Sequence, residues 1–506
     1  MRKMTEKSII IIGAGLAGLS AGCYAQMNGY RSYIFEHHSK PGGVAADWKR
    51  QGYLIDGGIH FLMWHRPSHP TYELYRELGA TQVNHFPDMT TYSRFIDEAS
   101  GTRLDVTCDL DRLKNDLKAI APEDTLLIDD LITGARSMQG SNMSFAASMM
   151  GKPPELMGLL DRLKQYWDMR KVFKYFTGKY AKPLADYAQA THSLLLRRIL
   201  ENLFLPEVPV WFVFMLLALL ADRQIGLLAR GCSGFVQPIE ERYKALGGEV
   251  AYEATVEEIL VENDRAVGVR LANGSDHHAD VVVSATDGHN TIFKMLGGRY
   301  VDEKTKERYR SWKLIRPVVM ISFGVARVFP DDPPLSFIML KDPIAIGTQA
   351  VHGFSLRIFN YGTKFAPTGK MVIQAMLETE WDFWNDLQKD QQRYDVEKQR
   401  VAKEVLVRLE AHYPGISSLV EVTDVATPYT IWRYTLNHNG AYMGWLPTPE
   451  GLMTMIPRTL PGLANFYMAG QWVLVGGGVP SCLYSGRHVV QILCQHERKR
   501  FSRTTS

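Results

Sequence analysis

Residues 8–18 read Ser-Ile-Ile-Ile-Ile-Gly-Ala-Gly-Leu-Ala-Gly. The β-branched run over residues 8–12 is typical of a buried parallel strand, and it leads directly into a G-x-G-x-x-G turn. We expect a helix from the end of this turn to Met27, and then a second strand that ends at Glu36. A strand, glycine turn, helix, strand and acidic residue in this order predict a dinucleotide-binding βαβ unit.

Each residue of the turn has a physical task in such a unit. Gly13 allows the tight turn, Gly15 lets the backbone approach a pyrophosphate, and Gly18 lets the helix pack on the strand. The first helical residues supply free N–H groups and the positive end of the helix dipole, and an acid after the second strand can bind ribose hydroxyls. The expected cofactor contacts are therefore Gly13, Gly15, Leu16, Ala17, Gly18 and Glu36.

Composition excludes several other classes of protein. The 506 residues suggest about three domains or one composite fold. Lys and Arg number 57 against 54 Asp and Glu, so the net charge of +3 does not predict a nucleic-acid partner. The five cysteines form no Cys-x-x-Cys pair, and neither a disulfide framework nor a metal site is expected. No apolar run reaches the roughly 18 residues of a membrane span, so we do not expect the chain to cross a membrane. The expected location is the cytoplasm, with peripheral contact to a membrane as an open alternative.

The sequence after Glu36 is more specific than the glycine turn. A short spacer leads to Gly42-Gly43-Val44, and an extended stretch then ends in Asp56-Gly57-Gly58. This pattern resembles the FAD-binding flavoproteins of the glutathione-reductase-like group, in particular the branch of amine oxidases, phytoene desaturases and carotenoid isomerases. The resemblance implies FAD as cofactor, with further contacts from Gly42, Gly43, Val44, Gly57 and Gly58. Many relatives have Arg where Val44 stands, which removes one polar flavin contact.

Two later segments extend the resemblance over nearly the whole chain. Residues 231–259 resemble the segment that returns to the FAD domain, in which the backbone at Val256 lies beside the adenine. Residues 467–486 resemble the last flavin-contacting motif and imply contacts from Gly470, Gln471, Gly478, Val479 and Pro480. Amine oxidases have Gly-Asp where this chain has Gly470-Gln471, which weakens the amine oxidase alternative.

The expected fold is α/β, with a discontinuous glutathione-reductase-like FAD-binding Rossmann domain and an inserted mixed α+β substrate domain. We assign residues 1–70, 229–298 and 455–498 to the FAD-binding domain. Residues 71–228 are expected to form a helical, substrate- or membrane-facing part, and residues 299–454 a sheet and helix. The apolar spacing of residues 391–412 predicts the helix that packs on this sheet.

The resemblance, which includes retinol saturases at residues 56–61, implies an FAD-dependent oxidoreductase. Its substrate would be a long apolar isoprenoid or polyene lipid, changed by desaturation, saturation or cis–trans isomerisation. Because the chain has one G-x-G-x-x-G, electrons would pass to oxygen or a quinone, or return to the substrate without an acceptor. The alternatives are a flavin-dependent amine oxidase, and a prenyl-lipid carrier of the GDP-dissociation-inhibitor type without redox turnover.

Residue roles on the substrate side are less clearly marked. His60 is the candidate for polarising the flavin ring or relaying a proton, and the alternative is a structural loop histidine. His37 and His38 are expected at the surface. Residues 155–183 alternate apolar and basic side chains at helical spacing, which predicts either peripheral membrane contact or a surface helix packed on the core. Residues 211–217 fit either membrane contact or a buried helix.

Overall fold

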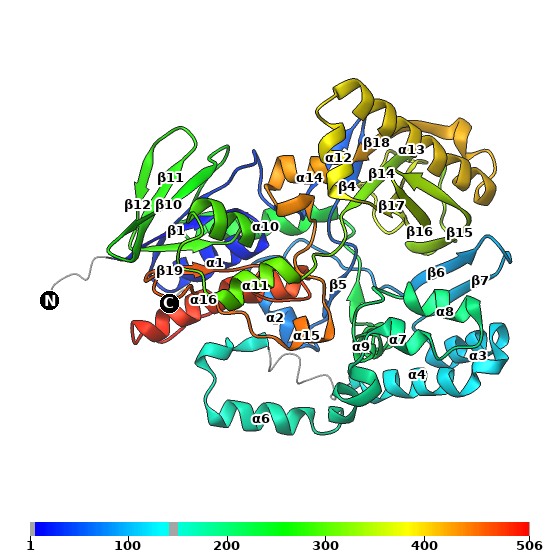
Figure 1. The fold of residues 1–506 in the computed structure, drawn as a ribbon, viewed down its shortest axis with the longest axis horizontal. Coiled ribbons are helices and arrows are strands. Elements are labelled where there is room, and N and C mark those ends of the chain that lie inside the picture. The colour runs from blue at the N-terminus through cyan, green and yellow to red at the C-terminus, as the bar shows by residue number, and fades with distance from the viewer. Residues whose placement is uncertain (1–5, 141–149, 505–506) are drawn as a thin grey trace.

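The computed structural model describes residues 6–140 and 150–504. One half of the molecule is built on a five-stranded parallel sheet with strand order β19-β13-β1-β2-β9 (Figure 1). The strands are β1 (Ser8–Ile12), β2 (Arg31–Phe35), β9 (Glu249–Ala251), β13 (Val281–Ser284) and β19 (Phe466–Met468). Three distant stretches of the chain therefore meet in one sheet, and we call this half the nucleotide half.

Both faces of β1 are buried, which explains its uninterrupted apolar sequence. Ile9 and Ile11 pack against the helices α1 (Leu16–Met27), α10 (Gly231–Ala245) and α16 (Gly478–His496). Ile10 and Ile12 face a three-stranded antiparallel sheet of β10 (Val256–Glu262), β11 (Arg265–Leu271) and β12 (Asp276–His278). The α/β fold expected from the βαβ unit is confirmed.

The other half, which we call the substrate half, is a seven-stranded mixed sheet with order β18-β14-β17-β16-β15-β6-β7 (Figure 1). The strands are β6 (Thr91–Asp97), β7 (Arg103–Thr107), β14 (Val318–Val325), β15 (Leu335–Ile346), β16 (Gln349–Ile358), β17 (Met371–Glu378) and β18 (Val420–Ala426). Alternate side chains such as Ile321 and Phe323 pack with the predicted helix, α13 (Gln391–His412), which buries Val401 and Leu409. The remaining side chains, among them Ser322, point to the other face of the sheet.

Residues 71–228 are less purely helical than the sequence suggested. Helices α3 (Leu110–Ile120), α4 (Thr125–Ser137), α7 (Leu184–Ala188), α8 (Leu194–Glu201) and α9 (Val210–Ala221) share one core. Strands β6 and β7, however, extend the substrate sheet, and Arg94 pairs with Ser336. Helix α9 is almost entirely buried, so residues 211–217 adopt the buried-helix alternative.

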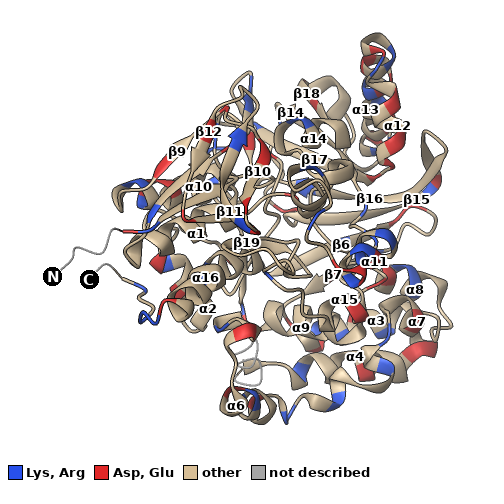
Figure 2. Cartoon of the chain, turned by 60° about the vertical axis from the view of Figure 1, so that its left-hand side comes forward, with Lys and Arg blue, Asp and Glu red and all other residues tan. Residues whose placement is uncertain are grey.

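Helix α6 (Leu159–Met169) stands apart from this core at the edge of the molecule (Figure 1, Figure 2). None of its residues is buried. Among the described helices, none is both long and apolar enough to cross a membrane.

Candidate functional site

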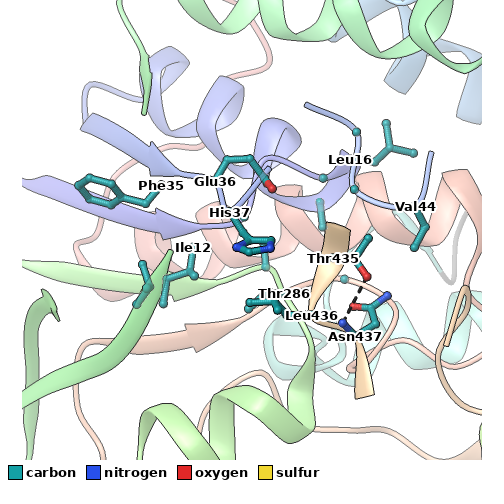
Figure 3. Close-up of a pocket in the computed structure, with 18 of the residues that line it drawn as sticks. Ile12, Leu16, Phe35, Glu36, His37, Val44, Thr286, Thr435, Leu436 and Asn437 are labelled. Atoms are coloured by element: carbon teal, nitrogen blue, oxygen red, sulfur yellow. Dashed lines mark hydrogen bonds between the residues drawn. The ribbon is translucent and has the colours of Figure 1, made fainter. Parts of the chain in front are cut away.

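A cavity opens at the carboxyl end of β1, where α1 begins. It encloses about 880 Å³, part of it open to solvent (Figure 3). A cleft at the carboxyl ends of parallel strands is the usual ligand site of this architecture. Its walls include eleven of the residues expected to contact the cofactor: Gly13, Gly15, Leu16, Ala17, Glu36, Gly42, Gly43, Val44, Val256, Gly470 and Gln471.

The other predicted residues lie outside the cavity wall. Gly18 packs within the glycine turn, and Gly57 and Gly58 lie behind the wall, where Gly58 abuts Val44 and Ala45. Gly478, Val479 and Pro480 form the first turn of α16. His60 lies two residues after Gly58 and does not line the cavity. Burial, with a smaller effect from the Arg357 charge, lowers the pKa of His60 to about 3, so its imidazole is neutral near pH 7.

The glycine turn has the shape that a dinucleotide requires. Gly13 adopts a φ of +96°, in the region that favours glycine. A Cβ at Gly18 would lie 1.9 Å from the carbonyl oxygen of Gly13, so this glycine permits close packing. A Cβ at Gly15 would meet only the Gly42 carbonyl oxygen, at 4.0 Å. The space beside Gly15 therefore belongs to the cavity, and the turn fits a close-lying pyrophosphate.

Glu36 is fixed in place by the same turn. Its carboxylate accepts hydrogen bonds from the backbone N–H groups of Ala14, at 2.6 Å, and His38, at 2.7 Å. Burial raises the pKa of this carboxyl, while the two N–H donors lower it. The side chain is thus oriented at the end of β2, where the ribose of a dinucleotide lies in this fold.

Sequence reasoning missed part of the cavity wall. His37, which is half-buried, lines the cavity (Figure 3). Its Nδ1 is 2.7 Å from Thr255 Oγ1, and its Nε2 is 3.0 Å from the carbonyl oxygen of Arg433. This side is completed by Thr435, the last residue of helix α14 (Pro428–Thr435), and by Leu436 and Asn437, which follow the helix. These residues are almost 400 positions away from His37, and only the turn-rich Asn-His-Asn-Gly at 437–440 marks a loop here.

Asp287 holds this loop against the nucleotide half. Its carboxylate accepts hydrogen bonds from the N–H groups of Asn290, at 2.6 Å, and His438, at 3.0 Å. The Asn290 amide in turn donates to the carbonyl oxygen of Leu436 at 3.0 Å. Burial raises the pKa of Asp287 to about 6, and the N–H donors oppose this shift.

The family described as flavin containing amine oxidoreductase matches residues 16–494. The chain belongs to this family. It is 24% identical to the chloroplastic prolycopene isomerase of Arabidopsis thaliana, over 96% of this chain and 82% of the relative. It is 23% identical to the lycopene-forming phytoene desaturase of Pseudescherichia vulneris, over 97% of this chain and 99% of the relative.

Solved structures share the fold. An oxidoreductase from Methanosarcina mazei aligns with a TM-score of 0.59 and 16% identity, covering 96% of this chain and all of the other. Cyclohexylamine oxidase from Brevibacterium oxydans aligns with a TM-score of 0.60 and 15% identity, covering 98% of this chain and all of the other.

Family membership makes the protein a flavin-dependent oxidoreductase. The dinucleotide turn and the oriented Glu36 fit the adenosine end of FAD, which is the cofactor. The carrier alternative is therefore not favoured. The amine oxidase alternative is also less favoured, because the sequence relatives described above are named as an isomerase and a desaturase.

Proposed function

We propose that the protein desaturates, saturates or isomerises carbon–carbon bonds of a long apolar polyene or isoprenoid lipid. The observation that carries this proposal is the similarity to prolycopene isomerase along 96% of the chain, together with the cavity described above. Bound FAD supplies two-electron acceptance or donation. The chain's own residues bind the cofactor, orient it and exclude water.

The substrate is expected on the far side of Trp472 from the glycine turn. Trp472 lines the cofactor cavity and also a second cavity of about 1410 Å³, part of it open to solvent. Tyr309, Trp312, Trp381 and Trp445 form much of the second cavity's wall. Aromatic faces suit a flat conjugated chain, whereas the charged side chains on the remaining wall, including Arg316 and Glu380, suit the solvent-facing mouth.

Residues 6–140 and 150–504 contain one parallel sheet, the one that forms the cofactor site. These residues therefore contain no second dinucleotide-binding fold that could hold a nicotinamide cofactor. We therefore propose that a net oxidation passes electrons to oxygen or a quinone. An isomerisation would return them to the substrate and need no acceptor.

Helix α6 supports peripheral contact with a membrane, from which an apolar lipid could be taken. Leu160 is 81% exposed and Leu163 55% exposed, although both are apolar. Basic side chains lie among them and beyond the helix end, and Arg170 stacks over Trp167 at 4.2 Å. Exposed apolar residues beside cations fit the interface of an anionic bilayer. The described contacts leave this face of α6 without protein cover.

Vesicle sedimentation tests the membrane proposal. Leu163→Asp should release the protein from anionic vesicles, because a carboxylate is repelled by the lipid headgroups. The control is Val396→Asp on α13, which changes a 63% exposed apolar residue on the substrate half. Equal binding by both variants and the native protein contradicts the role of α6.

Product analysis tests the chemistry. The purified protein with FAD is incubated with cis-polyenes in vesicles, with and without prior reduction, and the products are separated by chromatography. Trp381→Ala should raise the substrate concentration needed for half-maximal rate, whereas Trp432→Ala, which removes a nearby tryptophan outside the second cavity, should not. Turnover of primary amines and not of polyenes would favour the amine oxidase alternative.

A further inference from the structure

The segment from Asp56 to Ile59 forms the support behind one cavity wall. Asp56 accepts hydrogen bonds from the N–H groups of Cys232, at 2.8 Å, and Gly58, at 3.1 Å. A Cβ at Gly58 would lie 2.8 Å from the Val44 carbonyl oxygen and 2.9 Å from Ala45 Cα. Because Val44 and Ala45 line the cofactor cavity, a movement of this segment moves the wall.

Two side chains of the substrate sheet donate hydrogen bonds to the same segment from the opposite side. Gln374 on β17 donates from Nε2 to the Asp56 carbonyl oxygen at 2.9 Å. Arg357 on β16 donates from Nη2 to the Ile59 carbonyl oxygen at 3.4 Å. The two side chains are joined, because Arg357 Nη1 donates to Gln374 Oε1 at 3.3 Å. The carbonyls on either side of Gly57-Gly58 are thus both bound from the other half of the molecule.

Arg357 is also a buried charge without a contact ion pair. Its side chain donates to the amide oxygen of Gln374, the Ile59 carbonyl and the Tyr361 hydroxyl, all of them neutral oxygens. Among residues 6–140 and 150–504, no carboxylate lies within ion-pairing distance of its guanidinium. Burial of a charge without an ion-pair partner is destabilising in general. Asp56 acts on it only through space, and that carboxylate is already engaged by Cys232 and Gly58.

We propose that Arg357 and Gln374 are positioning residues of the flavin site. Gln374 fixes the Asp56–Ile59 segment by hydrogen bonding. Arg357 fixes it in the same way and also supplies a buried positive charge that favours the added negative charge of a reduced flavin. The proposal rests on the flavin assignment in the proposed function and is independent of the substrate class.

The midpoint potential of the bound flavin distinguishes an electrostatic role of Arg357 from a purely structural one. In Arg357→Met the potential should become more negative, because the reduced form loses electrostatic stabilisation. Arg357→Lys keeps the charge and should keep the potential near its native value. The matched control is Arg94→Met, which removes a half-buried guanidinium from β6 in the same sheet, where it pairs with Asp105 and Asp332.

Hydrogen exchange of the holoprotein tests the hydrogen-bonding role. Gln374→Met should speed exchange of the amides at residues 57–60 and leave the potential nearly unchanged. The proposal is overturned if folded, flavin-bound Arg357→Met has the native potential, or if Arg94→Met shifts it equally. If Arg357→Met does not fold, Arg357→Lys and Gln374→Met test the proposal instead. The proposal is then overturned if the amides of residues 57–60 exchange at the native rate in Gln374→Met. A shifted flavin potential in Arg357→Lys also overturns it. Since neither measurement uses substrate, inactivity on polyenes leaves the inference standing.

Discussion

Replacing Gly15 with alanine should remove the cofactor and leave the fold intact. Gly15 has φ −68° and ψ 176°, values that alanine also adopts. The added Cβ meets only the Gly42 carbonyl oxygen, at 4.0 Å, which is ordinary van der Waals contact. Gly15 is the N-cap of α1, and alanine at such a position costs at most about 1 kcal/mol. The thermal unfolding of the cofactor-free protein should therefore change little.

Gly15→Ala should instead lower the affinity of the protein for FAD. The methyl group occupies the space in which the pyrophosphate approaches the backbone, so one charge-assisted hydrogen bond is lengthened or lost. Such bonds contribute about 1.5–3 kcal/mol, which corresponds to a roughly 10- to 150-fold increase in Kd.

Fluorescence titration of the cofactor-free protein with FAD measures this increase. Gly151→Ala is the matched control, because a Cβ there meets no atom within 4 Å and the residue lies outside the cavity. A native Kd in Gly15→Ala would refute the placement of the pyrophosphate beside Gly15.

Three further substitutions test other parts of the account. Gly18→Ala places a Cβ 1.9 Å from the Gly13 carbonyl, so we expect a loss of stability of about 3 kcal/mol in denaturant unfolding, and native stability would contradict the packing. For Asp287, folding raises the pKa from 3.8 to about 6, so the native state binds this proton more tightly than the unfolded state. Its contribution to stability is therefore greatest below about pH 4 and falls by about 3 kcal/mol as the pH rises to 6. Asp287→Asn should lack this fall in stability between pH 4 and 6. If the curves of unfolding free energy against pH are parallel for Asp287→Asn and the native protein, the predicted contribution of Asp287 is wrong. Because His60 is neutral above about pH 4, His60→Gln should leave the pH–rate profile between pH 5 and 8 unchanged in shape. If the native pH–rate profile has a limb near pH 6.5 that is absent from the profile of His60→Gln, His60 titrates there and the prediction is wrong.

Local patterns predicted the parts of the fold that depend on neighbouring residues. The strand, turn and helix around Gly13–Gly18 form because β-branched residues, glycines and a helix follow one another within 20 positions. The helix over residues 391–412 is also confirmed, because its apolar side chains recur at helical spacing and pack against the sheet.

Contacts between distant segments could not be predicted in this way. The link from His37 to the Arg433 carbonyl depends on how the two halves meet, and neither residue type signals it. Strand β6 joins the sheet through β15, about 240 residues later, so its own sequence does not reveal its partner. For α6 the sequence left two alternatives open, contact with a membrane or packing on the protein core. An amphipathic pattern does not say whether the apolar side is covered by protein.

The most direct test of the central claim is the visible absorption spectrum of the purified protein, titrated anaerobically with polyenes in vesicles and separately with primary amines. The account predicts oxidised-flavin bands that respond to a polyene, by bleaching if the substrate is desaturated. If the bands persist, reduction with dithionite should be followed by saturation or isomerisation of the polyene. Bands that bleach with an amine and never respond to a polyene, or a protein without flavin bands that cannot be reconstituted with FAD, would contradict it.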